Sequence, residues 1–196
     1  MGNASGKNRK KRRTRKELEE LASVTEFDVV EIKQWYKSFL KDCPSGQLTV
    51  NQFVTVYSNF FSTGDEKSKE KMARQVFRNF DRDGGGTVDF REFICAMSVM
   101  SRGSTEQKLK WAFNMYDLDG NGTISKRELL EIITVVFNMK EREVKKLPED
   151  ESSPEKLTEK IFSELDTDQD GELSLKEFLE GNKRNPSIMK LMQPGP

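Results

Sequence analysis

Two stretches of twelve residues carry oxygen-bearing side chains at a spacing suited to a hard cation. They run from 117 to 128 (DLDGNGTISKRE) and from 166 to 177 (DTDQDGELSLKE). Both follow the pattern D-x-[DN]-x-[DN]-G-x5-E, in which side chains at positions 1, 3, 5 and 12 and the carbonyl at position 7 converge on Ca²⁺. A glycine at position 6 allows the sharp turn that wraps the chain around the ion. The predicted ligands are Asp117, Asp119, Asn121, Thr123, Glu128, Asp166, Asp168, Asp170, Glu172 and Glu177.

A third stretch, from 81 to 92 (DRDGGGTVDFRE), departs from this pattern at one position. Gly85 stands at position 5, so one side-chain oxygen is missing, and the run of three glycines raises the entropy lost when the loop is ordered. An aspartate at position 9 offers partial compensation. We therefore expect this loop to bind Ca²⁺ more weakly than the other two. Its predicted ligands are Asp81, Asp83, Thr87, Asp89 and Glu92.

A fourth copy, from Lys41 to Gln52, is degenerate. With Gly46 aligned at position 6, Lys41 takes position 1 and Gln52 takes position 12. A lysine ammonium repels a cation, and a neutral amide cannot replace the bidentate carboxylate. Pro44 also stiffens the turn. We expect this loop to bind no metal and to serve as the structural partner of the loop 81–92.

The residues around the four loops have helical spacing. Apolar side chains recur at i, i+3 and i+4 beside the loops, which predicts amphipathic flanking helices. Every copy has an aliphatic residue at position 8, which predicts short antiparallel bridges between paired loops. The sequence thus predicts an all-α fold of four EF-hands in two paired lobes. The expected segments are a basic tail (1–16), an N-terminal pair (17–100), a C-terminal pair (104–183) and a C-terminal tail with a short helix (184–196).

The composition argues against several other classes of protein. The 196 residues include no histidine, which removes the commonest general base and the commonest transition-metal ligand. We expect no enzyme, because the arranged carboxylates are already used as cation ligands. The two cysteines form no disulfide framework, which suits a reducing cytosol. No apolar run approaches the roughly 20 residues of a membrane span, and no secretory signal is visible.

The balance of charge hides a strongly basic segment. The chain has 33 basic and 33 acidic side chains, yet residues 7–16 contain eight basic residues and no acidic one. The remainder therefore carries a net charge of −8. Such a run favours binding to phosphates, of lipid or of nucleic acid, over a tail that only confers solubility. The residues concerned are Lys7, Arg9, Lys10, Lys11, Arg12, Arg13, Arg15 and Lys16.

Aromatic residues are concentrated in the first half of the chain. Most of them should form the core of the N-terminal lobe, but the set is larger than a lobe of this size needs. EF-hand pairs of the sensor type open on Ca²⁺ binding and expose a groove that receives an amphipathic helix or a lipid chain. We expect part of the aromatic set to face such a groove. The candidate groove residues are Trp35, Phe39, Phe53, Tyr57, Phe60, Phe77 and Phe90.

Several stretches beyond the loop ligands resemble one protein family. They are EIKQWYKSFLKDCPSG, VDFREF, EQKLKWAFNMYDLDGNG, LPEDESSPEKLTEKIF and NPSIMKLM. Together with three binding loops and one degenerate loop, they are similar to the neuronal calcium sensor family, and most of all to its hippocalcin, neurocalcin and visinin-like group. The resemblance covers nearly the whole chain. It implies a Ca²⁺ sensor, myristoylated on Gly2, that regulates a receptor, channel, cyclase or kinase at the membrane.

Two features depart from the family pattern. Gly6 stands where acylation motifs prefer serine or threonine, and the basic run of residues 7–16 is heavier than the resemblance implies. A myristoyl chain alone binds membranes only marginally, so the basic run supplies a second signal. Calcium would then control which surface is presented more than whether the protein is attached.

The leading interpretation is a cytoplasmic Ca²⁺ sensor, peripheral on anionic membranes, that binds an amphipathic helix of a membrane-associated target. Mg²⁺ is a candidate occupant of the loops at rest, and we expect a monomer or a weak dimer. One alternative is a nuclear or nucleic-acid-associated protein that uses the basic tail, although the acidic remainder of the chain disfavours nucleic acid as a partner. The other is a passive calcium buffer that exposes no apolar surface.

Overall fold

A computed structural model describes residues 13–59, 64–140 and 144–184. Four predictions fall wholly or partly beyond these ranges. The acylation site Gly2, the groove residue Phe60, the basic residues from Lys7 to Arg12 and the short C-terminal helix all lie outside the described residues.

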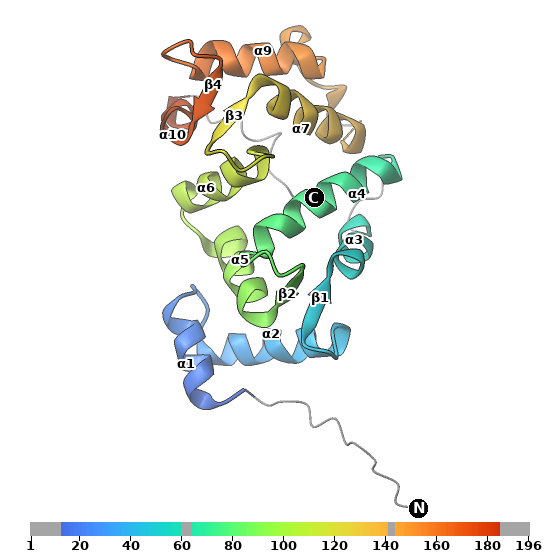
Figure 1. Ribbon diagram of the computed structural model, residues 1–196, viewed down its shortest axis with the longest axis vertical. Helices are drawn as coiled ribbons and strands as arrows, with labels where there is room; N and C mark the ends of the chain where they lie inside the picture. The colour runs from blue at the N-terminus through green and yellow to red at the C-terminus, as the bar shows by residue number, and fades with distance from the viewer. Residues whose placement is uncertain (1–12, 60–63, 141–143, 185–196) are drawn as a thin grey trace, which may run out of the picture.

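The N-terminal lobe is built from helices on either side of two short strands (Figure 1). Helices α2 and α3 flank the loop 41–52, and α4 and α5 flank the loop 81–92. The first helix begins within the segment expected to be tail and packs against α2. The elements are α1 (Arg15–Ser23), α2 (Val29–Asp42), β1 (Gln47–Thr49), α3 (Val50–Ser58), α4 (Glu66–Phe80), β2 (Thr87–Asp89) and α5 (Phe90–Arg102).

The C-terminal lobe repeats this arrangement after a two-residue connection, Gly103 and Ser104. Helices α6 and α7 flank the loop 117–128, and α9 and α10 flank the loop 166–177. The elements are α6 (Thr105–Tyr116), β3 (Thr123–Ser125), α7 (Lys126–Met139), the 3₁₀-helix η1 (Glu149–Glu151), α9 (Pro154–Leu165), β4 (Glu172–Ser174) and α10 (Leu175–Arg184). Within the described residues the fold is all-α apart from two small sheets, as predicted.

Each helix that follows a loop begins at position 10, directly after a capping residue at position 9. The side chain at position 9 accepts a hydrogen bond from the backbone N–H at position 12, and the side chain at position 12 accepts one from the N–H at position 9. This reciprocal capping satisfies two backbone donors that the helix itself leaves unpaired. Positions 9 and 12 therefore start a helix as well as contribute to the loop. The residues at position 9 are Thr49, Asp89, Ser125 and Ser174.

The aliphatic residues at position 8 pair across the two antiparallel sheets. Leu48 lies opposite Val88 in the sheet β1–β2, and Ile124 lies opposite Leu173 in the sheet β3–β4. All four side chains are buried. The prediction that the loops join in pairs through position 8 is confirmed, and it holds even for the degenerate loop.

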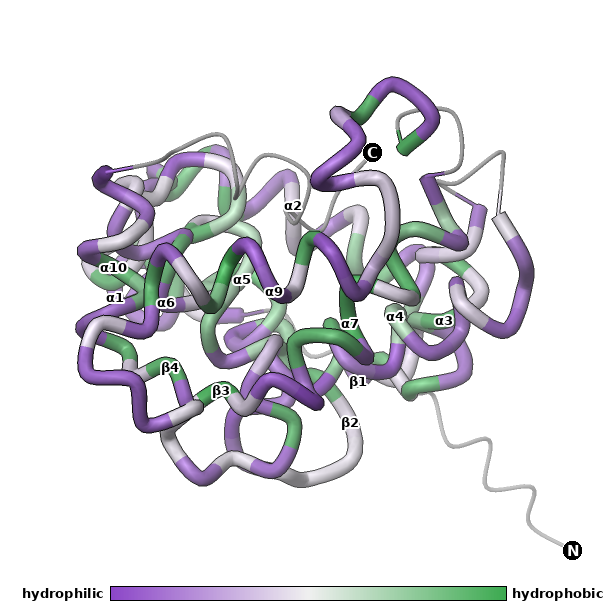
Figure 2. The backbone as a smooth tube through the Cα atoms, turned by 90° about the horizontal axis from the view of Figure 1, so that it is seen from above, coloured by the Kyte–Doolittle hydropathy of each residue, from purple (hydrophilic) through white to green (hydrophobic). Residues whose placement is uncertain are grey.

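The helices are amphipathic and turn their apolar faces inwards. Colouring by hydropathy shows purple and green alternating along the backbone, with α7 largely green (Figure 2). Buried apolar side chains of both lobes belong to one cluster, and α4 lies between the lobes, in contact with α6 and α7 (Figure 1). Among the described residues, no helix is both long and apolar enough to span a bilayer.

Candidate calcium sites

The described residues contain three carboxylate clusters, one in each of the loops predicted to bind a cation. Each cluster brings together the side chains of positions 1, 3 and 12, with one carboxylate oxygen from each residue lying within 4.8 Å of the others. Hard cations such as Ca²⁺ prefer clustered oxygen ligands of this kind. The clusters are Asp81, Asp83 and Glu92; Asp117, Asp119 and Glu128; and Asp166, Asp168 and Glu177.

The aspartate at position 1 holds each loop in its curved shape. Its Oδ2 accepts a hydrogen bond from the N–H of the position 6 glycine, at 2.9 Å from Gly86, 2.9 Å from Gly122 and 3.1 Å from Gly171. The other oxygen, Oδ1, of Asp81 and of Asp166 is buried and accepts no hydrogen bond from any described residue. A buried carboxylate oxygen without a partner is unfavourable unless a cation satisfies it, so both loops fit an ion.

The glutamate at position 12 is held over the loop by backbone donors. Oε1 of Glu128 accepts from the N–H groups of Leu118 and Asp119, at 2.9 and 3.2 Å, and Oε2 accepts from the N–H and hydroxyl of Ser125. Oε1 of Glu177 accepts from the N–H and hydroxyl of Thr167, and its Oε2 accepts from those of Ser174. Glu92 is held by backbone donors alone.

These contacts keep two position 12 carboxylates charged. Burial alone would raise the pKa of Glu128, but hydrogen bonds from Ser125, Asp119 and Leu118 outweigh it and hold the pKa below its usual value. The same balance, with Ser174 and Thr167 as donors, lowers the pKa of Glu177 to about 2. Each carboxylate is therefore ionised at neutral pH, as a ligand of a hard cation must be.

Position 5 distinguishes the loop 81–92 from the two loops of the C-terminal lobe. The Oδ1 atoms of Asn121 and Asp170 each accept a hydrogen bond of 2.8 Å from the N–H of position 7. Gly85 has no side chain to make this bond. Its own N–H donates to Oδ1 of Asp83 at 2.8 Å, which brings that oxygen close to the place where a Cβ atom would stand. The loop thus lacks an internal brace as well as a ligand oxygen.

The degenerate loop 41–52 has the scaffold of the other loops but no carboxylate at positions 1, 3 or 12. Oε1 of Gln52 accepts from the N–H and hydroxyl of Thr49, both at 2.9 Å, so the capping interaction survives. Position 4 has a positive φ in the other loops, at Gly84, Gly120 and Gln169, whereas proline fixes φ near −65°. Pro44 thus prevents the turn of a binding loop at position 4, a reason that adds to the loss of ligands.

Two side chains assigned to the metal through their backbone carbonyls also bond to each other. The hydroxyl of Thr123 donates to Oε2 of Glu172 at 2.6 Å and so links position 7 of one loop to position 7 of its partner. Sequence reasoning missed this link, because nothing in the pattern constrains the side chain at position 7.

The candidate groove residues lie in the N-terminal lobe and contact one another. Phe39, Phe53, Phe77 and Phe90 are buried in this structure, whereas Trp35 and Tyr57 are half-buried. Ring pairs connect them through the lobe, such as Phe39 with Phe90 at 5.5 Å between centroids and Phe53 with Phe77 at 5.7 Å. Their role in a groove stays a prediction.

Three of the basic residues assigned to membrane binding are described. The guanidinium of Arg13 lies over the rings of Tyr36 and Phe90, at 5.5 and 5.4 Å from their centroids. Arg15 and Lys16 lie in the first turn of α1, where Arg15 pairs with Glu19 at 2.7 Å. The described end of the basic segment thus lies against aromatic side chains of α2 and α5, which include Tyr36 and Phe90. We call this part of the N-terminal lobe its aromatic face.

Comparison with known proteins agrees with this geometry. Models of the EF-hand domain pair match residues 44–99 and 106–181. Recoverin of Homo sapiens is 45% identical over 177 residues, which cover 90% of this chain and 87% of recoverin. Neuronal calcium sensor 1 of Aplysia californica is 49% identical over 176 residues, or 90% of each chain. Guanylyl cyclase-activating protein 2 of Lithobates pipiens is 39% identical over 180 residues, which cover 90% of this chain and 88% of that protein.

Identity at this level over nine-tenths of the chain shows common descent. The match to two EF-hand pairs and to proteins named as calcium sensors makes the chain a calcium-binding regulatory protein and not an enzyme. It belongs to the neuronal calcium sensor family.

Proposed function

We propose that three loops of this sensor bind Ca²⁺ and control how its N-terminal lobe meets a target at a membrane. The observation that carries the proposal is the presence of three clusters of carboxylates, two of which include a buried oxygen without a hydrogen-bond partner among the described residues. When bound, Ca²⁺ supplies two positive charges that offset the clustered acids. The residues of the loops 81–92, 117–128 and 166–177 hold it, and the loop 41–52 stays empty.

The three loops differ in their expected affinity. Sensor loops bind Ca²⁺ with dissociation constants of about 10⁻⁷ to 10⁻⁵ M. We expect the loop 81–92 to have the highest dissociation constant of the three. Gly85 provides neither a ligand oxygen nor an acceptor for the N–H at position 7. Mg²⁺ is a candidate occupant of the stronger loops at resting Ca²⁺ concentrations, since it also binds carboxylate oxygens.

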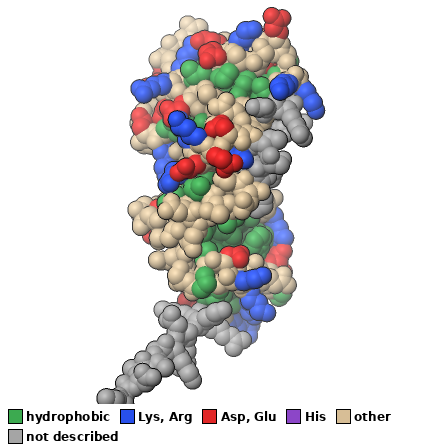
Figure 3. Space-filling view, turned by 90° about the vertical axis from the view of Figure 1, so that its right-hand side faces the viewer, with side chains coloured by type: hydrophobic (Ala, Val, Ile, Leu, Met, Phe, Trp, Pro, Cys, Tyr) green, Lys and Arg blue, Asp and Glu red, His purple; other side chains and the backbone are tan. Residues whose placement is uncertain are grey.

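The target site is assigned to the aromatic face of the N-terminal lobe. Hydrophobic side chains gather on the lower part of the face shown in Figure 3, which belongs to this lobe. Val30 of α2 and Val56 of α3, both in this lobe, are 61% and 51% exposed. Opening of the lobe would add the candidate groove residues to this surface, and an amphipathic helix of a membrane-associated protein suits such a surface. The name of guanylyl cyclase-activating protein 2 gives one class of target for a relative.

The membrane contact is assigned to acylated Gly2 and to the basic residues 7–16, with the protein cytoplasmic and peripheral on the bilayer. A single acyl chain needs a second signal for stable attachment, and each basic residue near an anionic surface contributes about 1 kcal/mol. The body carries a net charge of −8 without the tail, so it would not be drawn to the same surface. We infer a monomer or weak dimer as the attached form.

The experiment is co-sedimentation with liposomes of the chain co-expressed with an N-myristoyltransferase, on anionic and on neutral lipid, with Ca²⁺ or with chelator. We expect Gly2→Ala to abolish binding to neutral lipid. Replacing Lys10, Lys11 and Arg12 with glutamine should weaken binding to anionic lipid by roughly 100-fold, which corresponds to about 3 kcal/mol. The matched control replaces Lys33, Lys37 and Lys41, which are exposed on α2, with glutamine. This control should bind like the native chain.

Two results would contradict the proposal. Equal losses in both triple variants would mean that the tail has no special role. Failure to pellet under any condition would reject the membrane assignment and favour the nuclear or buffer alternatives. A buffer would also show no Ca²⁺-dependent fluorescence of a dye that binds apolar surface, whereas a sensor exposes that surface.

A further inference from the structure

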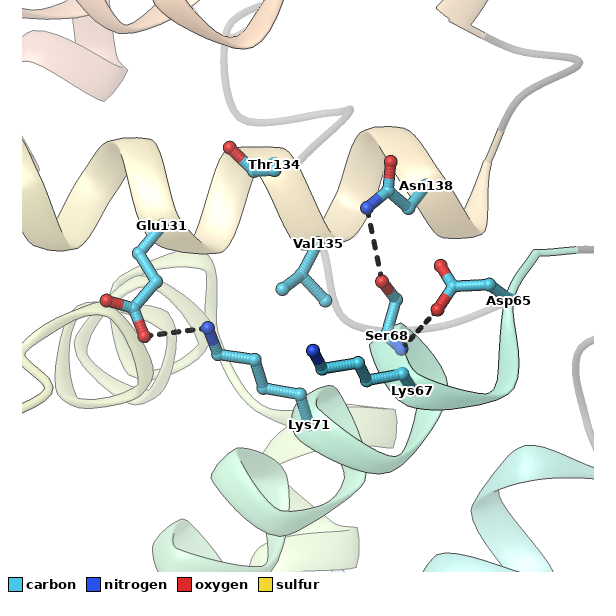
Figure 4. Close-up of a pocket in the computed structure, with 8 residues that line it drawn as sticks. All are labelled: Asp65, Lys67, Ser68, Lys71, Glu131, Thr134, Val135 and Asn138. Atoms are coloured by element: carbon cyan, nitrogen blue, oxygen red, sulfur yellow. Dashed lines mark hydrogen bonds and ion pairs between the residues drawn. The ribbon is translucent and has the colours of Figure 1, made fainter.

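The two lobes meet along one face of α4. Residues three and four apart on a helix share a face, and on α4 such a series of polar residues reaches the C-terminal lobe. Ser68 bonds to Asn138 at 3.3 Å, and Lys71 pairs with Glu131 at 2.8 Å. Figure 4 shows both pairs crossing between α4 and α7 beside a cavity of about 730 Å³. The series continues with Gln75, whose amide donates to the carbonyl of Met115 at 2.7 Å, and ends at Arg78.

Arg78 binds the backbone at the start of the third loop. Its guanidinium donates to the carbonyl oxygen of Asn114 at 3.1 Å and to the carbonyl oxygens of Asp117 and Leu118. These carbonyls lie at the end of α6, where a helix leaves its last carbonyls unpaired and favours a cation. Asp117 and Leu118 occupy positions 1 and 2 of the loop 117–128.

The same two peptide groups hold the position 12 carboxylate. The carbonyl of Asp117 shares a planar peptide with the N–H of Leu118, and the carbonyl of Leu118 shares one with the N–H of Asp119. Both N–H groups donate to Oε1 of Glu128, at 2.9 and 3.2 Å. Arg78 therefore binds the oxygen side of each peptide whose nitrogen side binds Glu128. Hydrogen bonds linked in this way orient and polarise one another.

Arg78 also belongs to the second EF-hand. It lies in the last turn of α4, three residues before Asp81, which is position 1 of the loop 81–92. A change in the loop 81–92 that shifts the end of α4 must therefore move the group that orients the peptides beneath Glu128. Glu92 binds both corresponding peptides of its own loop, and Glu177 binds one, through the N–H of Thr167. Among the described residues, no side chain of the other lobe supports these peptides as Arg78 does.

We propose that Arg78 is a positioning residue that couples Ca²⁺ binding in the loop 81–92 to Ca²⁺ binding in the loop 117–128, across the boundary between the lobes. This inference rests on the proposed function, because it requires both loops to bind the ion. Coupling between sites is reciprocal, so occupation of either loop strengthens the other by the same factor.

The experiment follows each loop separately by NMR during a Ca²⁺ titration of the full chain. The amides of Gly86, Gly122 and Gly171 each donate to the position 1 aspartate of their own loop, so each reports on one site. The loop 117–128 is expected to fill before the weaker loop 81–92, so the full coupling is read at the weaker loop. Glu128→Gln disables the loop 117–128, and we expect it to weaken Ca²⁺ binding at Gly86 by at least about fivefold, the lower end of typical coupling. In the Arg78→Met background, Glu128→Gln should change binding at Gly86 by less than about twofold.

The matched control is Arg74→Met. Arg74 lies one turn earlier on the same helix, but among the residues that the structure describes it bonds only to Glu70 and Asn51, both in its own lobe. The control should keep the fivefold effect. Arg78→Lys, which keeps the charge but cannot bridge two carbonyls as a planar fork does, should reduce the coupling. If Arg78→Met disturbs folding of the ion-free protein, Arg78→Lys replaces it in the experiment.

Two results would overturn the inference while leaving the proposed function intact. In the first, Glu128→Gln does not change binding at Gly86 in the otherwise native chain. In the second, it changes binding equally with and without Arg78. By contrast, the absence of any Ca²⁺ response at all three glycines would reject the proposed function itself.

Discussion

The pair of loops in the C-terminal lobe and the pair in the N-terminal lobe share one scaffold and differ in the side chains that they offer to a cation. Both pairs are joined by an antiparallel bridge at position 8, and in both pairs the following helices are capped at position 9. Only the C-terminal pair has an oxygen-bearing side chain at position 5 of both loops with a bond to position 7. Within the described parts of the chain, a side-chain hydrogen bond between paired loops occurs only there, from Thr123 to Glu172.

The difference shows that the shape of a loop and its affinity for an ion have separate causes. The loop 41–52 keeps the bridge, the cap and the positive φ of Gly46 without any carboxylate at positions 1, 3 or 12. Its scaffold is thus supported by backbone hydrogen bonds and by burial of Leu48. Ion binding depends on a small number of further atoms, which substitution can remove or restore.

The largest expected effect comes from Glu128→Gln. Gln52 shows that glutamine at position 12 still caps the next helix, so the lobe should lose no more than about 2 kcal/mol of stability. The affinity of the loop 117–128 should fall by about 100-fold or more, because the bidentate charged ligand is gone. Calorimetry and the Gly122 amide would measure this loss. A fall in affinity matched by unfolding of the ion-free lobe would contradict the separation of shape from binding.

The next effect is the gain of a fourth site. Lys41→Asp, Cys43→Asp and Gln52→Glu restore three ligands, but we expect the chain to bind three ions while Pro44 remains, because proline cannot adopt a positive φ. Adding Pro44→Gly should raise the stoichiometry to four in calorimetric titration. Pro44→Gly alone is the control and should leave it at three. Four ions bound with Pro44 in place would show that position 4 is not a barrier.

A smaller effect is expected at Gly85. Gly85→Asn supplies the missing oxygen and the hydrogen bond to position 7, so the loop 81–92 should bind Ca²⁺ roughly five- to tenfold more tightly. The new Cβ would lie 2.8 Å from Oδ1 of Asp83, the end of a flexible side chain that can move aside. The Gly86 amide would report the change. Gly85→Ala has the same Cβ without the oxygen, and an equal gain there would attribute the effect to chain stiffness alone.

The smallest effect concerns Gln169, which has a φ of 59° at position 4, where the other binding loops have glycine. Gln169→Gly should relieve strain and stabilise the ion-free chain by less than about 1 kcal/mol, since glycine loses more entropy on folding. This corresponds to a rise of about 2 °C in melting temperature measured with chelator. Gly120→Gln is the reverse change and should lower it. A fall with Gln169→Gly would mean that entropy dominates strain.

The sequence predicted the features that depend on residue type at a set position. The clustering of carboxylates in three loops and the pairing of loops through position 8 follow from local chemistry, and the structure has both. The contacts of Arg78 could not be predicted, because their acceptors are backbone carbonyls 36 to 40 residues away, and every residue has a carbonyl. The positive φ of Gln169 could not be predicted either, because glutamine, unlike glycine, has no preference for that conformation.

The position of Arg13 over Tyr36 and Phe90 gives the N-terminal segment a fixed origin. Eleven peptide units separate Gly2 from Arg13, so their Cα atoms can be at most about 40 Å apart. A lipid attached to Gly2 would be tethered within that radius of the aromatic face, at an effective concentration on the order of millimolar. Its partition between this lobe and a bilayer would then depend on tether length, and lengthening the segment between residues 2 and 13 would shift it towards the bilayer.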